Sequence, residues 1–189
     1  MMKKYRIYLL ALVVVLQTAA LAGMVAMKHR TLITGKPVLL ETKPIDPRSL
    51  FRGDYVRLNY TISSLDYAEV EGDDDFERRD QIYVVLRKGE KFWRAVSIHH
   101  EMPAHGPDSV VIRGEAQYTG LWIDGESRDG INIRYGIENY FVPEGEGMAL
   151  ELPAVGEEVT MLIAVDKAGA SAIKAVLVDD EVRYEEKLF

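Results

Sequence analysis

The sequence predicts a mainly β protein, in which an N-terminal transmembrane helix precedes one antiparallel β-barrel or sandwich-like domain with little helix. Two observations predict this fold. Residues Ile7 to Met27 form an uncharged apolar run, and the rest of the chain is dominated by a hydrophobic period of two. A period of two places alternate side chains on opposite faces of a strand. We therefore divide the chain into an anchor, residues 1–30, and a β domain, residues 31–189.

The apolar run is long enough to cross a bilayer. It has 21 residues and is interrupted only by Gln17 and Thr18. At about 1.5 Å per residue in a helix, it spans roughly 30 Å, the thickness of the hydrocarbon layer. The membrane is therefore an expected partner, through Ile7 to Met27.

The distribution of basic residues predicts the orientation of this helix. Three basic residues precede the run, and no acidic residue occurs before Glu41. Cytoplasmic flanks are enriched in Lys and Arg, which favours a single-pass protein with a cytoplasmic N-terminus and an extracytoplasmic domain, periplasmic in a Gram-negative cell. Lys28 and Arg30, on the other side of the run, weaken this bias. The three preceding residues are Lys3, Lys4 and Arg6.

A cleavable secretory signal is the competing interpretation of the same segment. Ile7 to Leu16 would serve as its apolar region, and Ala20-Leu21-Ala22 has the small-x-small form of a cleavage site. We favour the anchor because the apolar residues continue past Ala22 to Met27. Both interpretations export the domain.

The charge of the exported part argues against nucleic acid as a partner. From residue 31 onward, 18 Lys and Arg face 30 Asp and Glu, a net charge of about −12. Neutralising phosphates requires a basic surface, which this composition does not supply. The chain has no cysteine, so disulfides and acylation at a lipoprotein cysteine are impossible.

Eight short runs predict strands, which in this number favour a barrel or a sandwich. Two hairpins are expected between neighbouring runs, at Arg87 to Glu90 and at Asp166 to Gly169, each with a glycine for the turn. The expected strands are Val38 to Thr42, Tyr55 to Ser63, Gln81 to Arg87, Phe92 to His99, Val110 to Thr119, Ile131 to Ile137, Val159 to Val165 and Ala172 to Val178.

Two polar stretches lack a sustained period. Ser63 to Asp80 is expected to be an exposed connection with a short helix near Asp75 to Arg79. Glu138 to Glu157 contains two prolines and several glycines, and leaves room for about two helical turns around Gly147 to Leu152.

The segment GDYVRLNY, Gly53 to Tyr60, joins a chain reversal to a strand and matches a family signature. The matching residues are Gly53, Asp54, Tyr55, Leu58 and Tyr60. The chain resembles the GDYXXLXY family of bacterial membrane-anchored proteins, and the resemblance extends through DPRSLFRGDYVRLNY and YGIENYFVPEGEG, Tyr135 to Gly147. It implies a cell-membrane location and an association with multi-pass membrane proteins, but no reaction.

The faces of the signature strand follow from its period. Leu58, Tyr60 and Ile62, with Val56, are expected to point into the core, and Tyr55, Arg57, Asn59 and Thr61 to point away from it.

The polar residues of the two signature segments are expected to converge, because the first is rich in arginine and the second in glutamate. They could form a structural lock of Arg–carboxylate pairs, in which Asp54 is a turn residue and Tyr60 a core aromatic. They could also form a ligand-binding or hydrolytic site. The candidate residues are Asp46, Arg48, Asp54, Tyr55, Arg57, Tyr60, Tyr135, Glu138, Tyr140 and Glu144.

No cofactor or metal is predicted. His99, His100, Glu101 and His105 are close in sequence, but a strand places His99 and Glu101 on a different face from His100. Asp73 to Asp75 lacks the glycine and the closing glutamate of an EF-hand. No nucleophile, base and orienting group form a complete catalytic set, so an enzyme is left open and a non-catalytic accessory module is favoured.

Overall fold

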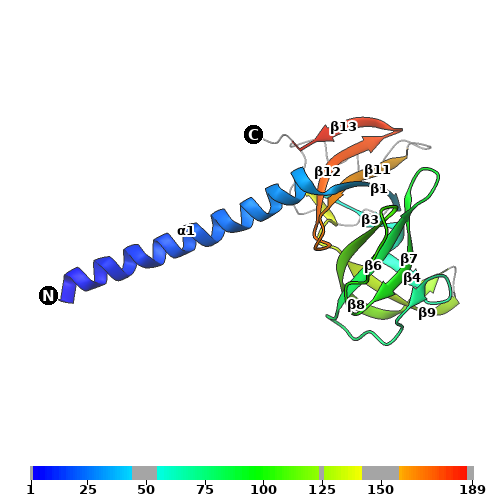
Figure 1. Cartoon of the computed structure of the whole chain (residues 1–189), viewed down its shortest axis with the longest axis horizontal. Helices are drawn as coiled ribbons and strands as arrows, with labels where there is room; N and C mark the ends of the chain where they lie inside the picture. Colours follow the sequence, from blue (N-terminus) through cyan, green and yellow to red (C-terminus); the bar gives the residue numbers. More distant parts are fainter. Residues whose placement is uncertain (1, 44–54, 124–125, 142–157, 187–189) are drawn as a thin grey trace.

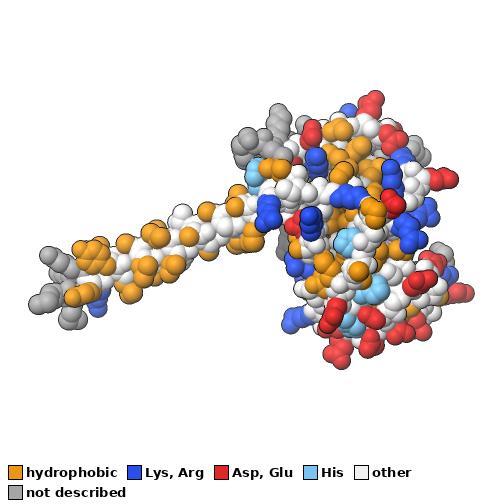
Figure 2. Space-filling view, in the orientation of Figure 1, with side chains coloured by type: hydrophobic (Ala, Val, Ile, Leu, Met, Phe, Trp, Pro, Cys, Tyr) orange, Lys and Arg blue, Asp and Glu red, His pale blue; other side chains and the backbone are white. Residues whose placement is uncertain are grey.

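The computed structural model describes residues 2–43, 55–123, 126–141 and 158–186. It begins with one long helix, α1 (Met2–Thr34), which projects from a β domain (Figure 1). Residues Tyr5–Thr34 are apolar enough and long enough to cross a membrane. Their side chains are exposed until the last turns, and Figure 2 shows hydrophobic groups along the length of the helix. The expected apolar helix is therefore present.

In the described residues, the β domain consists of two large curled sheets and one short ribbon. The sheets have the strand orders β13-β12-β11-β1-β3 and β4-β9-β8-β6-β7-β5, and the ribbon pairs β10 with β2. Among the described strands, all pairs are antiparallel except β5 with β7. The strands are β1 (Lys36–Lys43), β2 (Tyr55–Arg57), β3 (Asn59–Tyr60), β4 (Ser64–Asp66), β5 (Glu71–Gly72), β6 (Gln81–Lys88), β7 (Trp93–His99), β8 (Ser109–Ile123), β9 (Glu126–Arg134), β10 (Asn139–Phe141), β11 (Val159–Val165), β12 (Ser171–Val178) and β13 (Glu181–Glu185).

The period of two produces the core that it predicts. In β6, Ile82, Val84 and Leu86 are fully buried while the residues between them are half-buried. The same alternation places Val38 and Leu40 of β1 in the shared core. A helix preceding one mainly β, sandwich-like domain is therefore confirmed. Strands occur at the expected places, except that the run from Tyr55 to Ser63 is divided and the strand expected from Ile131 to Ile137 ends at Arg134.

The prediction of one continuous strand from Tyr55 to Ser63 is wrong. The chain pairs with β10 along β2, then with β1 along β3, and then forms a single 3₁₀ turn, η1 (Thr61–Ser63). Leu58, Tyr60 and Ile62 are nevertheless buried as expected. The period of two identifies which side chains are buried, but it does not identify the neighbouring strand or the point at which the chain changes neighbours.

The short helix expected near Asp75 to Arg79 is also wrong. The Asp80 carboxylate accepts a hydrogen bond from the Glu77 backbone N–H at 2.8 Å, which makes a turn. Arg79 has a φ of 77°, which a right-handed helix does not allow. The surrounding connection contains the short strands β4 and β5. The helix expected around Gly147 to Leu152 lies outside the described residues.

Both expected hairpins are present, and the second one is held by an aspartate. The Asp166 carboxylate accepts hydrogen bonds from the backbone N–H groups of Ala168 and Ala170, at 2.9 and 3.0 Å. Gly169 has a φ of 79°, which the turn requires and which glycine adopts without steric cost. This β11–β12 hairpin lies next to the end of α1.

The last turns of α1 are docked on the β domain, with no linker between them. The Thr31 side chain is 4 % exposed, and its hydroxyl donates to the Asp166 carboxylate at 2.9 Å. The Lys28 ammonium donates to the Ser171 backbone carbonyl, also at 2.9 Å. A Cβ added at Gly35 would lie 2.5 Å from the Thr31 carbonyl oxygen and 2.9 Å from the Ala164 Cβ. We call this contact, formed by Lys28, Thr31, Gly35, Asp166 and Ser171, the helix–domain joint.

Candidate functional site

The two signature segments lie side by side, as the short ribbon of β2 and β10. Arg57 is opposite Asn139, Val56 opposite Tyr140 and Tyr55 opposite Phe141. The Leu58 backbone N–H continues the pairing by donating to the Glu138 carbonyl at 2.7 Å. Two segments that are about 80 residues apart in sequence therefore meet through backbone hydrogen bonds. The complementary charges of their side chains did not by themselves predict this pairing.

Two buried tyrosines connect the same two segments through their hydroxyl groups. The Tyr60 hydroxyl donates to the Ile137 carbonyl at 2.6 Å, and the Tyr135 hydroxyl donates to the Ile62 carbonyl at 2.7 Å. Burial, together with the negative charge of Glu138, raises the pKa of both phenols well above the usual value. Both therefore remain neutral donors at physiological pH. This crossed pair of hydrogen bonds gives the two tyrosines a structural role.

The Glu138 carboxylate is used by its own turn. It accepts hydrogen bonds from the backbone N–H groups of Tyr135 and Gly136, the latter at 2.9 Å. We expected it to pair with an arginine of the first segment. These two bonds satisfy N–H groups that the turn after β9 leaves without strand partners. Pairing with an arginine stays a prediction, because the structure does not describe the side chains of Arg48, Arg52 and Arg57.

Replacing Glu138 by alanine should lower the free energy of unfolding by about 1–2 kcal/mol, because two backbone donors lose a charged acceptor. Glutamine keeps one acceptor oxygen and should recover part of the loss. Urea unfolding of the full chain in a mild detergent, monitored by tryptophan fluorescence, measures the stability of both variants. Glu126→Ala, on an exposed position of β9, is the matched control. Equal unfolding midpoints for all variants would contradict this role.

The other predicted site residues are distributed unevenly. Tyr140 is buried, at 8 % exposure, and belongs to the core. Tyr55 and Arg57 are placed by their backbone in β2. Asp46, Arg48, Asp54 and Glu144 lie outside the described residues. The polar groups of Tyr60, Tyr135 and Glu138 bind backbone atoms. The polar site as a whole stays a prediction.

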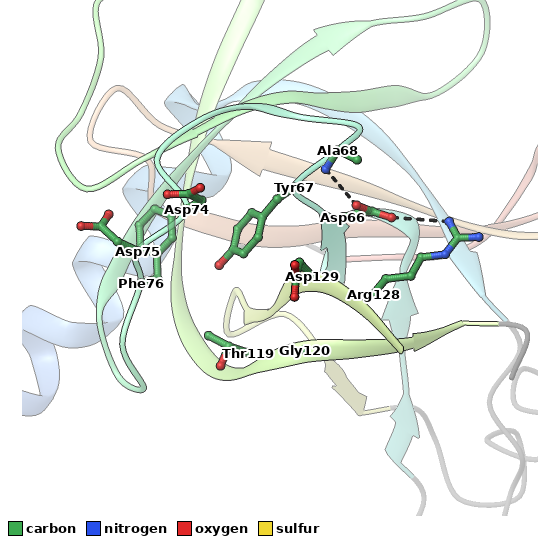
Figure 3. Close-up of a pocket in the computed structure, with 11 residues that line it drawn as sticks. Asp66, Tyr67, Ala68, Asp74, Asp75, Phe76, Thr119, Gly120, Arg128 and Asp129 are labelled. Carbon is green, nitrogen blue, oxygen red and sulfur yellow. Dashed lines mark hydrogen bonds and ion pairs between the residues drawn. The ribbon is translucent and has the colours of Figure 1, made fainter. Parts of the chain in front are cut away.

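A second candidate site is an open groove that the sequence did not suggest (Figure 3). It has a volume of about 1110 Å³. Pairing of β4 with β9 brings Asp66 opposite Gly130, which places the Asp66 to Ala68 turn beside Arg128 and Asp129. The groove is lined by Asp66, Tyr67, Ala68, Asp74, Asp75, Phe76, Thr119, Gly120, Arg128, Asp129 and Gly130.

The groove is acidic and contains one ion pair. Asp66, whose side chain is 10 % exposed, pairs with Arg128 at 3.4 Å. The Tyr67 hydroxyl is enclosed and has no hydrogen-bond partner among the described residues. Burial, followed by the charges of Asp74, Asp75 and Asp129, raises the pKa of Tyr67. The arrangement favours cationic groups over anionic ones, and no sequence signal could have located it, because it depends on the β4–β9 pairing.

The clustered histidines do not form a metal site in the described residues, where no group of three or more possible ligands converges. His100 instead holds the acidic loop against β7. Its Nε2 lies 2.9 Å from an Asp75 oxygen, its backbone N–H donates to Asp73 at 2.8 Å, and its ring lies 4.2 Å from that of Phe76. The sequence grouped His100 with its chain neighbours, whereas the fold groups it with residues 73 to 76.

This contact should titrate. The hydrogen bond with Asp75 and the charges of Asp75, Asp73 and Asp80 raise the pKa of His100, and the same hydrogen bond lowers the pKa of Asp75. Because the pKa of His100 is raised in the folded protein, the contribution of its protonated ring to stability is complete below about pH 6.5. This contribution is lost as the pH rises through the pKa of His100 in the folded protein. Because the pKa of Asp75 is lowered in the folded protein, the contribution of its carboxylate to stability is complete above about pH 4. This contribution is lost as the pH falls through the pKa of Asp75 in the folded protein. The contact is therefore strongest between these limits.

An NMR titration of the histidine ring protons tests this expectation. The signal that disappears in His100→Gln should titrate above the usual histidine value, and Asp75→Asn should lower its midpoint. Asp108→Asn, which changes an acidic residue in another loop, is the control. The ion pair is absent if Asp75→Asn and the parent have the same midpoint.

The comparisons with known proteins agree with the signature. The model of the family described as GDYXXLXY protein matches residues 17–176, which include the second half of α1, both signature segments, β11 and most of β12, but not β13. No curated protein and no solved structure matches the chain significantly. The match covers most of the chain. Of the residues that give the family its name, Tyr55 lies in β2 and Leu58 and Tyr60 are buried, whereas Gly53 and Asp54 lie outside the described residues. The chain belongs to the GDYXXLXY protein family.

Proposed function

We propose that this protein is a non-catalytic accessory module of a bacterial cell membrane, anchored by α1 and working outside the cytoplasm with a multi-pass membrane protein. The chain crosses the membrane once, with its N-terminus in the cytoplasm. The β domain is held at the extracytoplasmic surface, and is periplasmic if the cell is Gram-negative.

The helix–domain joint is the observation that carries this proposal. A flexible tether suits a domain that searches for its ligand, whereas a docked helix fixes both the height and the rotation of the domain above the membrane. Thr31 and Lys28 each bind the β11–β12 end of the domain. A module with a fixed orientation is suited to a neighbour that is itself fixed in the membrane.

The use of the signature residues supports an interaction role over a hydrolytic one. Tyr60, Tyr135 and Glu138 direct their polar groups to backbone atoms, which stabilises the fold around the signature and leaves no acid–base pair among them. The acidic groove adds a place where basic side chains of another protein would be favoured electrostatically.

Fractionation and N-terminal sequencing test the anchor. The full chain should remain in the membrane pellet after carbonate extraction and keep its original N-terminus. A mature protein that begins at Gly23 and is free in the envelope fraction would establish a secretory signal and refute the anchor.

Site-specific crosslinking tests the partner. A photoreactive residue at exposed domain positions, such as Thr119 in the groove and Val182 on β13, should capture a multi-pass membrane protein from intact cells. Turnover of a substrate that is abolished by Glu138→Ala without loss of fold would refute a non-catalytic module.

A further inference from the structure

Gln17 lies at the midpoint of the uncharged run, with ten residues on each side to Ile7 and Met27. In a membrane-spanning helix, its amide is therefore at the centre of the hydrocarbon layer. The amide can donate two hydrogen bonds and accept two, and it finds no partner among the described residues. A polar group without a partner is most costly at this depth, because no water is available.

Helical geometry places Gln17 on the same side of α1 as the β domain. Lys28 and Gly35 follow Gln17 by 11 and 18 residues, which are close to three and five whole turns at about 3.6 residues per turn. Both belong to the helix–domain joint, and the buried Thr31 lies on the same side. Arg30 and Ile33, which point away from this side, are exposed. α1 enters the domain directly, so this alignment is kept along the helix (Figure 1).

We infer that the Gln17 face of α1, formed by Val13, Gln17, Leu21 and Met24, is the docking surface for a transmembrane helix of another membrane protein, which presents a polar side chain at the same depth. This inference rests on the proposed membrane anchor. The partner helix lies beneath the β domain and ends at the membrane surface, as the transmembrane helices of a multi-pass protein with short loops do. Its polar side chain completes the hydrogen bonds of the Gln17 amide.

A second copy of α1 does not fit this face. Two helices that pack closely have axes about 8–10 Å apart. Each copy carries its own β domain on its Gln17 side, fixed there by Thr31 and Asp166 at 2.9 Å. A parallel pair with these sides facing each other would therefore bring both domains into the same space above the helices.

Photocrosslinking along α1 of the full chain in intact cells tests the inference. Replacing Leu21 or Met24 by benzoylphenylalanine probes the Gln17 face. Replacing Ala19 or Ala26 by benzoylphenylalanine probes the opposite face. Two differently tagged copies of the chain are expressed together, so that an adduct between copies is recognised. We expect adducts from Leu21 and Met24 that map to one transmembrane helix of a different protein.

Three variants show whether the amide is responsible. Gln17→Leu should reduce these adducts about fivefold or more, because an interhelical polar contact in the membrane is lost. Gln17→Asn keeps an amide and should restore much of the signal, and Thr18→Val, one position away on another side of the helix, should leave it unchanged. Replacing the polar residue of the captured helix by leucine should produce the same loss as Gln17→Leu.

The remaining outcomes overturn the inference in distinguishable ways. Adducts that carry both tags would mean that a second copy occupies the face, and adducts from Ala19 and Ala26 alone would assign the opposite face. Equal yields with Gln17→Leu would remove the amide from the contact. If α1 gives no adduct while Thr119 or Val182 still captures a membrane protein, this inference fails and the proposed function stands. Release of the chain by carbonate would defeat both.

Discussion

Replacing Tyr60 by alanine should lower the free energy of unfolding by about 3–5 kcal/mol, the largest effect expected for a single side chain of the signature. Tyr60 is fully buried in the shared core, and its hydroxyl satisfies the Ile137 carbonyl across the two signature segments. Its removal leaves a cavity and an unpaired carbonyl. A domain of this size is typically stable by about 5–15 kcal/mol, so much of its stability should be lost.

Two further variants separate the ring of Tyr60 from its hydroxyl. Tyr60→Phe keeps the ring and should cost about 1–2 kcal/mol, because only the hydrogen bond to Ile137 is lost. Tyr118→Ala makes the same truncation on a side chain that is 58 % exposed, and should change the stability by less than about 1 kcal/mol. Urea unfolding of the full chain in detergent measures all three. A Tyr60→Ala midpoint as high as that of Tyr118→Ala would contradict the buried position.

Replacing Gly35 by alanine should break the helix–domain joint. The added Cβ would lie 2.5 Å from the Thr31 carbonyl and 2.9 Å from the Val165 nitrogen, and these are backbone atoms that cannot move aside easily. Overpacking of this kind costs about 1–3 kcal/mol. A change of backbone angles at residue 35 would relieve the contact with Thr31, and separation of the β domain from α1 would relieve the contact with Val165. We therefore expect the rotation of the domain relative to the helix to become variable.

Spin-label distances measure this change directly. The chain has no cysteine, so Met24→Cys and Val182→Cys introduce two defined labels, one on α1 and one on β13. The parent should give a narrow distance distribution, and Gly35→Ala a broad one. Gly106→Ala, at a glycine with nothing within 4 Å of the added Cβ, should remain narrow. An equally narrow distribution in Gly35→Ala would mean that the joint tolerates the extra atom.

The candidate site was only partly readable from the sequence. The complementary signature segments indicated a meeting of distant parts of the chain, and backbone pairing of β2 with β10 agrees with that expectation. The hydrogen bonds of the Glu138 carboxylate to Tyr135 and Gly136 were not predictable, because a carboxylate can accept from backbone N–H groups as well as from arginines and the local turn geometry decides this. The glycine that follows α1, with Pro37 two residues later, was the available signal for the helix end at Thr34.

The sequence alone determined the apolar helix, the mainly β domain, the two hairpins and the buried face of the signature. These features follow from the local hydrophobic period, the distribution of charges and the residues of the turns, all of which depend on residues close together in the sequence. Only the tertiary structure decided that the chain changes partners at Leu58, that Asp166 joins a hairpin to α1, and that Asp66, Asp74 and Asp129 share a groove. Each of these features depends on which strands pair and in which register. Strand pairing is determined by the packing of the whole core, and no short segment of sequence specifies it.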